Sequence, residues 1–286
     1  LVGSEMCIRD SSDVAICYIS DSVDQSVLDR MRSLIQSIDV DALTMNIESL
    51  AECMFTHKWI NPFPKFKYSE RPDTATAAIL DGNIVIMVDN SPAVMIIPAS
   101  IFDIIEEADD FNFSPMIGSY LRITRFFFSI VTWILTPLWL LLVNNPEWVP
   151  EFMKFILITD DITVPVLLQL LILELAVDGL KLAAVNTPTM LSTPLSIVAG
   201  IVVGEYAVSS GWFNPESLLY MAVVTVGTYG QTNFEMGYAF KFLRVLTLIL
   251  TQIFNLGGFI AGVVISVLMI AVSYTHLRAH ETRSNL

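Results

Sequence analysis

Apolar residues in the first part of the chain recur with the periods of strands and helices. Residues 13–19 form a short apolar run, and residues 23–38 carry apolar side chains at helical spacing, which predicts a buried strand followed by an amphipathic helix. A weaker helical pattern covers residues 39–55. Two further apolar runs, residues 83–88 and 93–97, flank an Asp-Asn-Ser-Pro turn and predict a β-hairpin. We expect a small α/β domain.

Beyond residue 120 the pattern changes to long uncharged stretches. About 20 apolar residues span a bilayer, so the pattern predicts an α-helical membrane domain with about five transmembrane segments. The second stretch is only 12 residues long, and it is either a span with buried carboxylates or a helix lying partly in the interface. The last has 33 residues without a charge and is either one tilted span or two segments that break at 255–258. The five stretches are 126–143, 162–173, 182–204, 217–234 and 245–277.

The two ends differ in composition from the acidic and apolar segments beside them. Residues 1–11 and 273–286 resemble translated sequencing-adapter read-through, and we expect a non-native leader and a non-native tail. The remaining chain is then an internal fragment of a longer protein. We predict a cytosolic α/β domain at 12–120, itself a fragment of a larger N-terminal region, followed by a helical membrane domain at 121–272.

Composition agrees with a membrane protein. The 286 residues are 54% hydrophobic and only 15% charged, whereas soluble domains have about 25% charged residues. Residues 1–120 hold 19 Asp and Glu against 7 Lys and Arg, so most of the net charge of −14 lies in the predicted cytosolic domain. No Lys/Arg cluster that would contact phosphates is present, which excludes nucleic acid as a partner.

Candidate chemistry in the soluble part is sparse. The three cysteines and three histidines lack metal-ligand spacing, so we expect no metal, no cofactor and no disulfide framework. No phosphate loop, Ser/His/Asp order or carboxylate pair beside a cleft signal is present, so the chain is not expected to be an enzyme. One motif, Glu70, Arg71, Pro72 and Asp73, predicts an ion-paired turn between Glu70 and Arg71 or between Arg71 and Asp73. Its expected role is local structure or a subunit contact.

Basic residues supply an orientation for the membrane domain. They occupy alternate connections between the apolar stretches, and positive connections face the cytoplasm. The acidic N-terminal domain is therefore expected in the cytosol, with the chain crossing the membrane five times from there. The residues concerned are Arg122, Arg125, Lys181, Lys241 and Arg244.

Two pairs of glycines, Gly200 with Gly204 and Gly258 with Gly262, fit the GxxxG pattern that lets helix backbones approach closely. Helix packing is the simpler interpretation, and specific oligomerisation is the alternative. The pore or helix-packing candidates are Gly200, Val203, Gly204, Glu205, Gly258 and Gly262.

Three carboxylates lie within or at the edge of apolar stretches. An ionisable group at mid-bilayer costs at least about 2.5 kcal/mol, so it normally faces a cavity, a partner or water. Glu174 and Asp178 share one helix face, and Lys181 is the expected partner of Asp178 at the membrane edge. Glu205 is either a member of a carboxylate ring around a symmetry axis, which would select cations, or a solvent-exposed helix end.

Six motifs follow one another along the chain: PFP at 62–64, ERPD at 70–73, LDGNIVIMVDNSP at 80–92, IIP at 96–98, DGLKLAAVNTP at 178–188 and SIVAGIVVGEYAV at 196–208. Taken in order, they resemble the GerA-type A subunits of bacterial spore-germination complexes. The resemblance covers nearly all of residues 12–272. At residues 177–184 the chain reads VDGLKLAA where nutrient-receptor A subunits read FELLREAG, which favours the stage V sporulation AF branch over direct nutrient sensing.

The resemblance implies an integral protein of the spore inner membrane that forms a pentameric ion channel and releases ions during germination. It also implies a small membrane partner protein and other membrane germination proteins as partners. The leading hypothesis is a channel subunit in which residues 196–208 line or adjoin the pore. The runner-up is a non-conducting scaffold or receptor subunit. A secondary transporter built on Glu174 and Asp178 ranks last, because no internal repeat is present.

Overall fold

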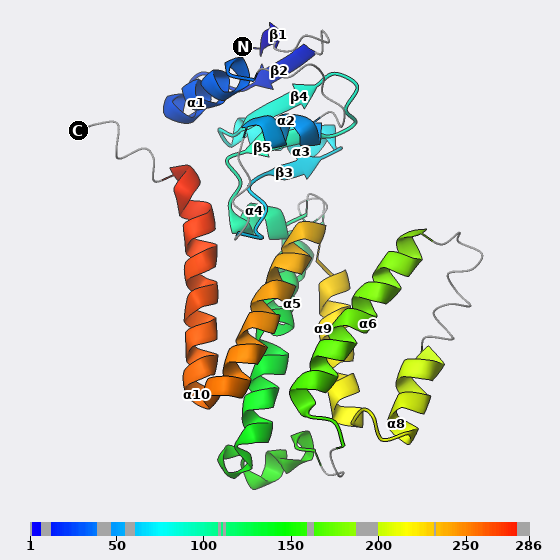
Figure 1. The fold of residues 1–286 in the computed structure, drawn as a ribbon. Helices are drawn as coiled ribbons and strands as arrows, with labels where there is room; N and C mark the ends of the chain where they lie inside the picture. Colours follow the sequence, from blue (N-terminus) through cyan, green and yellow to red (C-terminus); the bar gives the residue numbers. More distant parts are fainter. Residues whose placement is uncertain are drawn as a thin grey trace. The chain divides into compact units, whose positions relative to one another are not determined.

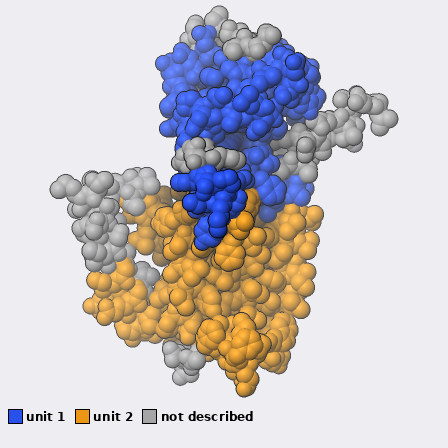
Figure 2. Space-filling model, turned by 180° about the vertical axis from the view of Figure 1, so that it is seen from behind, with its two compact units in different colours: residues 1–122, 269–286 blue, residues 123–268 orange. Residues whose placement is uncertain are grey.

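The computed structural model divides the chain into two compact units, residues 1–122 with 269–286 and residues 123–268 (Figure 2). The first unit contains a β-sheet and the second is helical. The structure describes residues 2–6, 13–38, 47–54, 61–107, 110, 113–158, 163–186, 200–231 and 233–278. At residues 2–6, 184–186, 202–203 and 274–278 it describes the backbone alone.

The sheet of the first unit has five antiparallel strands in the order β1-β2-β4-β5-β3. The predicted hairpin is present as β4 and β5, with Ile86 opposite Met95. Asn90 in the connecting turn has a φ of 59°, a conformation that Asn tolerates better than most residues. The strands are β1 Val2–Met6, β2 Asp13–Cys17, β3 Lys67–Ser69, β4 Ile84–Val88 and β5 Val94–Ile97.

Alternate residues of the sheet pack against helices on its two faces. Successive side chains of a strand point to opposite faces, so Ile84 and Ile86 pack with α1 and α2, while Val85 packs with Ala75 of α3. Helix α1 begins where the Asp24 carboxylate accepts a 2.9 Å hydrogen bond from the Ser26 amide. The helices are α1 Gln25–Gln36, α2 Ile47–Met54, α3 Pro72–Leu80 and α4 Ile101–Ile105.

Two elements of this unit differ from the expectations. Strand β1 falls inside the predicted non-native leader and still pairs with β2, because an open sheet edge pairs with an adjacent extended segment through backbone groups alone. Whether the leader and the tail are foreign stays a prediction. The predicted turn at residues 70–73 is the start of α3, since Pro72 and Asp73 favour the first turn of a helix.

The second unit is a bundle whose helices run alternately in opposite directions (Figure 1). Its core includes Trp139 and Leu140 of α5, Leu170 of α6, Met221 of α9 and Leu248 of α10. The 3-10 helices η2 Pro146–Trp148 and η3 Glu151–Ile156 follow α5. The remaining elements are α5 Pro115–Asn144, α6 Val166–Asn186, the π-helical η4 Gly200–Tyr206, α8 Ala207–Ser209, α9 Pro215–Tyr229 and α10 Phe234–Arg278.

The expectation of about five transmembrane segments needs correction. Within the described part of the chain, two helices are long and apolar enough to cross a membrane, Pro115–Asn144 and Phe234–Ser273. Helix α6 carries three charged side chains that bind other parts of the protein or line a cavity, and α9 has only 15 residues. Most of the predicted stretch 182–204 lies outside the described residues.

Helix α10 reverses direction within its length. Asn255 has φ 51° and ψ −129°, which no helix accommodates, and the two arms fold back beside each other (Figure 1). A Cβ added to Gly258 would lie 1.8 Å from the Leu250 carbonyl oxygen, and one on Gly262 would lie 2.8 Å from Thr247 Cγ2. The last apolar run therefore breaks at the position that the sequence offered as an alternative, and its two glycines lie where the arms pack.

Candidate functional site

Two acids on α6 face two bases on α10. Glu174 and Asp178 lie four residues apart, and Lys241 and Arg244 lie three apart, so each pair occupies one face of its helix. The helices run in opposite directions (Figure 1), which brings Glu174 opposite Arg244 and Asp178 opposite Lys241.

The Glu174–Arg244 pair is bidentate and buried. Arg244 donates from Nε to Glu174 Oε1 and from Nη2 to Oε2, the latter at 2.8 Å. Its Nη1 donates to the Thr132 carbonyl of α5. Glu174 is 4% exposed and Arg244 is 3% exposed. Such pairing offsets the large cost of removing two charges from water, and it ties α5, α6 and α10 together.

Lys241 joins the two acids. Its ammonium pairs with Asp178, donates to the Glu174 carbonyl oxygen at 3.2 Å and lies 3.7 Å from Glu174 Oε2. The structure does not contain the expected Asp178–Lys181 pair, because the half-buried Lys241 of another helix pairs with the Asp178 carboxylate. Lys181 instead lies over two rings, 5.3 Å from the centroid of Tyr229 and 5.6 Å from that of Tyr238.

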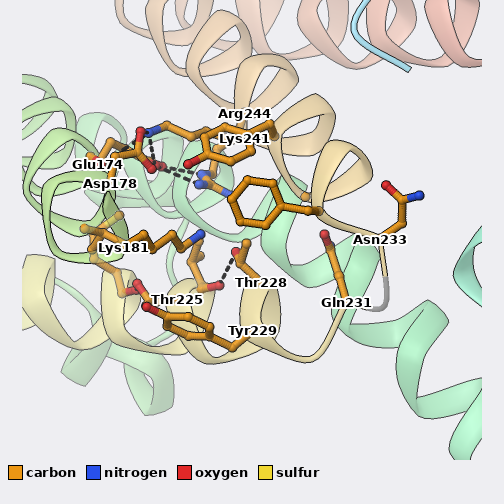
Figure 3. Close-up of a pocket in the computed structure, with 16 residues that line it drawn as sticks. Glu174, Asp178, Lys181, Thr225, Thr228, Tyr229, Gln231, Asn233, Lys241 and Arg244 are labelled. Carbon is orange, nitrogen blue, oxygen red and sulfur yellow. Dashed lines mark hydrogen bonds and ion pairs between the residues drawn. The ribbon is translucent and has the colours of Figure 1, made fainter. Parts of the chain in front are cut away.

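The charge cluster borders a cavity of about 360 Å³ between α6, α9 and α10 (Figure 3). Gln231 at its edge donates from Nε2 to Thr132 Oγ1 at 3.3 Å. Its Oε1 is buried and accepts no hydrogen bond within the described part of the chain. Further lining residues include Met221, Val224, Thr225, Thr228, Asn233 and Phe234.

Segment η4 takes no part in this charge cluster. Gly200, Gly204 and Glu205 are exposed, and a Cβ added to either glycine meets no atom within 4 Å. The side chain of Val203 is outside the described residues. The two GxxxG pairs therefore differ: Gly258 and Gly262 are covered by their own chain, whereas Gly200 and Gly204 are not.

The motif at residues 70–73 forms a surface ion pair. Arg71 donates from Nη2 to Asp73 Oδ2 at 2.7 Å and from Nε to Oδ1 at 3.2 Å. Together with the Thr74 amide, this lowers the pKa of the Asp73 carboxyl from 3.8 to about 2. Glu70 is exposed. Of the two pairings that the sequence allows, the structure contains the one between Arg71 and Asp73.

A smaller hollow of about 220 Å³ lies beside this motif in the first unit. Lys67 borders it and donates to the carbonyl oxygens of Asp103 and Glu106 at 2.6 and 3.2 Å. Burial lowers the pKa of the Lys67 ammonium, and four nearby acids oppose that shift. Within the described ranges no group of three or more His, Cys, Asp or Glu residues is placed to hold a metal ion.

The sequence pattern predicts the two acids of the cluster but not their partners. It places Lys241 and Arg244 in a cytosolic connection, and no motif marks Gln231, Tyr229 or Tyr238. The spacing of the charges could have indicated the pairing, because two acids four apart on one apolar segment match two bases three apart on another.

Comparisons with known proteins cover nearly the whole chain. Residues 4–278 match the family model described as Bacillus/Clostridium GerA spore germination protein. The chain is 36% identical over 265 residues to stage V sporulation protein AF of Bacillus subtilis (strain 168), covering 93% of this chain and 53% of that protein. It is 26% identical over 274 residues to spore germination protein XA of Bacillus anthracis, covering 95% of this chain and 54% of that protein.

One solved structure is also similar, the N-terminal domain of the A subunit of the Bacillus megaterium spore germinant receptor GerK3. It is 30% identical, with a TM-score of 0.26, and the match covers 35% of this chain and 78% of that one. The chain spans about half the length of the two curated relatives described above. Because the family model matches almost every residue, the chain belongs to the GerA family of spore germination proteins.

Proposed function

We propose that this chain is part of an integral membrane subunit that assembles with copies of itself into an ion channel and releases ions during spore germination. Membership of the GerA family supports the germination role. In this proposal the protein lies in the spore inner membrane with its sheet domain in the cytosol, forms a pentamer and acts with other membrane germination proteins. Nucleic acid has no part in it, and no catalytic step is assigned.

The observation that carries the channel proposal is the exposed surface of η4. Glu205 is exposed on a short helix of an apolar unit, and Gly200 and Gly204 leave the neighbouring surface without side chains. A carboxylate in contact with lipid is costly. In a symmetric assembly the glycines would let helices from neighbouring copies approach, and the Glu205 carboxylates would face a shared aqueous axis, where a ring of acids selects cations.

The test is conductance of the full-length protein in liposomes. Glu205→Gln should reduce the preference for K⁺ over Cl⁻, and Val203→Trp should reduce the current. Glu235→Gln is the matched control, because it removes one exposed acid from the first turn of α10. Unchanged selectivity and current in both η4 variants would exclude η4 from the pore.

A scaffold role remains the second candidate. It is favoured by the first unit, a folded sheet domain with the exposed Arg71–Asp73 pair on its surface. The same liposomes distinguish the two functions. If the full-length protein carries no current, alone or with its germination partners, the scaffold replaces the channel.

A further inference from the structure

The cavity beside the charge cluster is lined by more cations than acids. Two carboxylates, Glu174 and Asp178, face three cations. Both carboxylates are engaged by α10, through Arg244 and Lys241. The lining therefore carries an uncompensated charge of +1 in a chain whose net charge is −14.

The uncompensated cation is Lys181. Among the described residues no carboxylate forms an ion pair with it, and its ammonium lies over the rings of Tyr229 and Tyr238. Ring faces attract an ammonium, but they carry no net charge. A bound anion would therefore supply the negative charge that the rings cannot give to this ammonium.

The remaining lining residues provide apolar wall and hydrogen-bond donors for a ligand. Met221, Val224 and Phe234 provide apolar wall, which strengthens electrostatic attraction by excluding water. Asn233 uses Oδ1 to accept from the Met236 amide at 3.0 Å, so its amide N–H groups remain donors. The Gln231 Oε1 has no donor among the described residues, but it is closed to a water-sized group and therefore does not specify the ligand.

We propose that this cavity binds a phosphate ester, with the phosphate against Lys181. A volume of about 360 Å³ lies at the lower end of small-molecule sites, which span roughly 300–1,000 Å³. The same chemistry has two sources, the glycerol headgroup of a membrane phospholipid and a soluble glycerol phosphate. The site is independent of η4 and of the proposed conduction.

The experiment uses the full-length protein in vesicles of three kinds. These are phosphatidylcholine alone, phosphatidylcholine with phosphatidylglycerol, and phosphatidylcholine with sn-glycerol 3-phosphate in the buffer. The thermal unfolding midpoint is measured as a function of the added ligand. We expect one of the two phosphate esters to raise the midpoint, and its apparent affinity to fall about tenfold in Lys181→Gln, as for the loss of one charged hydrogen bond.

Two further variants separate the cavity from general surface charge. Lys181→Arg should retain binding. Lys154→Gln removes an equal charge from an exposed lysine paired with Glu151 and should bind as the wild type does.

Each outcome decides the proposal. Stabilisation by phosphatidylglycerol alone assigns the site to lipid, and stabilisation by glycerol phosphate in the absence of phosphatidylglycerol assigns it to a soluble ester. Equal responses of wild type and Lys181→Gln, or no response to either ester, overturn it. Because binding is measured by the unfolding midpoint, a failure here leaves the conductance test of Glu205 unaffected.

Discussion

Asn145 and Asn255 exchange two side-chain hydrogen bonds across 110 residues of sequence. Asn145 donates to Asn255 Oδ1 at 2.6 Å, and Asn255 donates to Asn145 Oδ1 at 2.9 Å. Asn145 also donates to the Leu141 carbonyl at 2.8 Å, directly after the end of α5. The reversal of α10 is thereby attached to α5 at the residue whose backbone leaves the helical conformation.

Removing either amide should destabilise the second unit to a similar extent. We expect Asn145→Ala and Asn255→Ala each to lower the free energy of unfolding by about 0.5–2 kcal/mol, as for hydrogen bonds between membrane helices. The double variant should cost little more than the worse single one, because both break the same pair. Unfolding in mixed detergent micelles measures this.

Asn255→Gly is the control for backbone conformation. Glycine adopts a positive φ without strain, so this variant should cost less than Asn255→Ala although it loses the same hydrogen bonds. Strictly additive effects of the two alanine substitutions would show that the amides do not act as a pair.

The buried Glu174–Arg244 pair should be sensitive to single changes and tolerant of a joint one. Arg244→Met leaves the Glu174 carboxylate buried with fewer donors, and we expect a loss of about 3–5 kcal/mol in unfolding free energy. Replacing both residues, Glu174→Leu with Arg244→Met, should recover most of that loss. Lys154→Met, in an exposed pair, should cost at most about 1 kcal/mol. A double variant as unstable as Arg244→Met would contradict this account.

The four glycines should respond differently to alanine. A Cβ at Gly258 would collide with the Leu250 backbone, so Gly258→Ala should destabilise by about 1–3 kcal/mol. Gly262→Ala should cost less, because the nearest atom is a methyl of Thr247. Gly200→Ala and Gly204→Ala meet open space, and the unfolding free energy of the isolated subunit should stay equal or rise. Thermal unfolding of the four variants in detergent provides the comparison.

The same four variants also report on assembly. A lower oligomer mass in Gly200→Ala or Gly204→Ala, at unchanged subunit stability, would place η4 at a contact between copies. If every variant retains the wild-type mass and stability, neither glycine pair packs closely.

Acid should weaken the first unit through Asp73. The pKa of this carboxyl is lowered to about 2, first by its hydrogen bonds from Arg71. The stabilisation is therefore complete above the unfolded pKa of 3.8 and is lost as the pH falls through about 2. In Arg71→Gln the carboxyl should titrate closer to 3.8. The ¹³C shift of the Asp73 carboxyl in labelled protein measures the midpoint.

Arg32→Gln serves as the control for this titration, because Arg32 pairs with Asp29 on α1 and not with Asp73. An identical Asp73 midpoint in wild type and Arg71→Gln would show that the guanidinium does not set the pKa.

Elements with a local signal were predicted well from the sequence. Helix α1 and the β4–β5 hairpin depend on residue spacing and turn chemistry within a few positions, and both are present. Helix α3 was missed because residues 70–73 predict an ion-paired turn, whereas Pro72 stands at the start of a helix. Membership of the GerA family also followed from ordered motifs.

The candidate site was only half predictable, for a physical reason. The cost of burying Glu174 and Asp178 predicts that each carboxylate has a partner, but the neighbouring sequence does not identify the partners. The partners lie 63 to 70 residues away, on a helix that the folded chain brings alongside. Counting charges between apolar stretches instead assigned Lys241 and Arg244 to a loop. The number of spans was overestimated because uncharged stretches were counted without knowing the helix bounds, and α9 has only 15 residues.

The reversal of α10 at Asn255 also determines the parity of the membrane topology. A single span would move the chain from one leaflet to the other across its last apolar run. A hairpin brings it back to the leaflet that it entered from, so this run contributes an even number of crossings or none. Under the positive-inside rule, basic residues before and after the run are then counted on the same side of the membrane rather than on opposite sides. In the proposed bilayer arrangement, both ends of this apolar run therefore lie on the same side of the membrane.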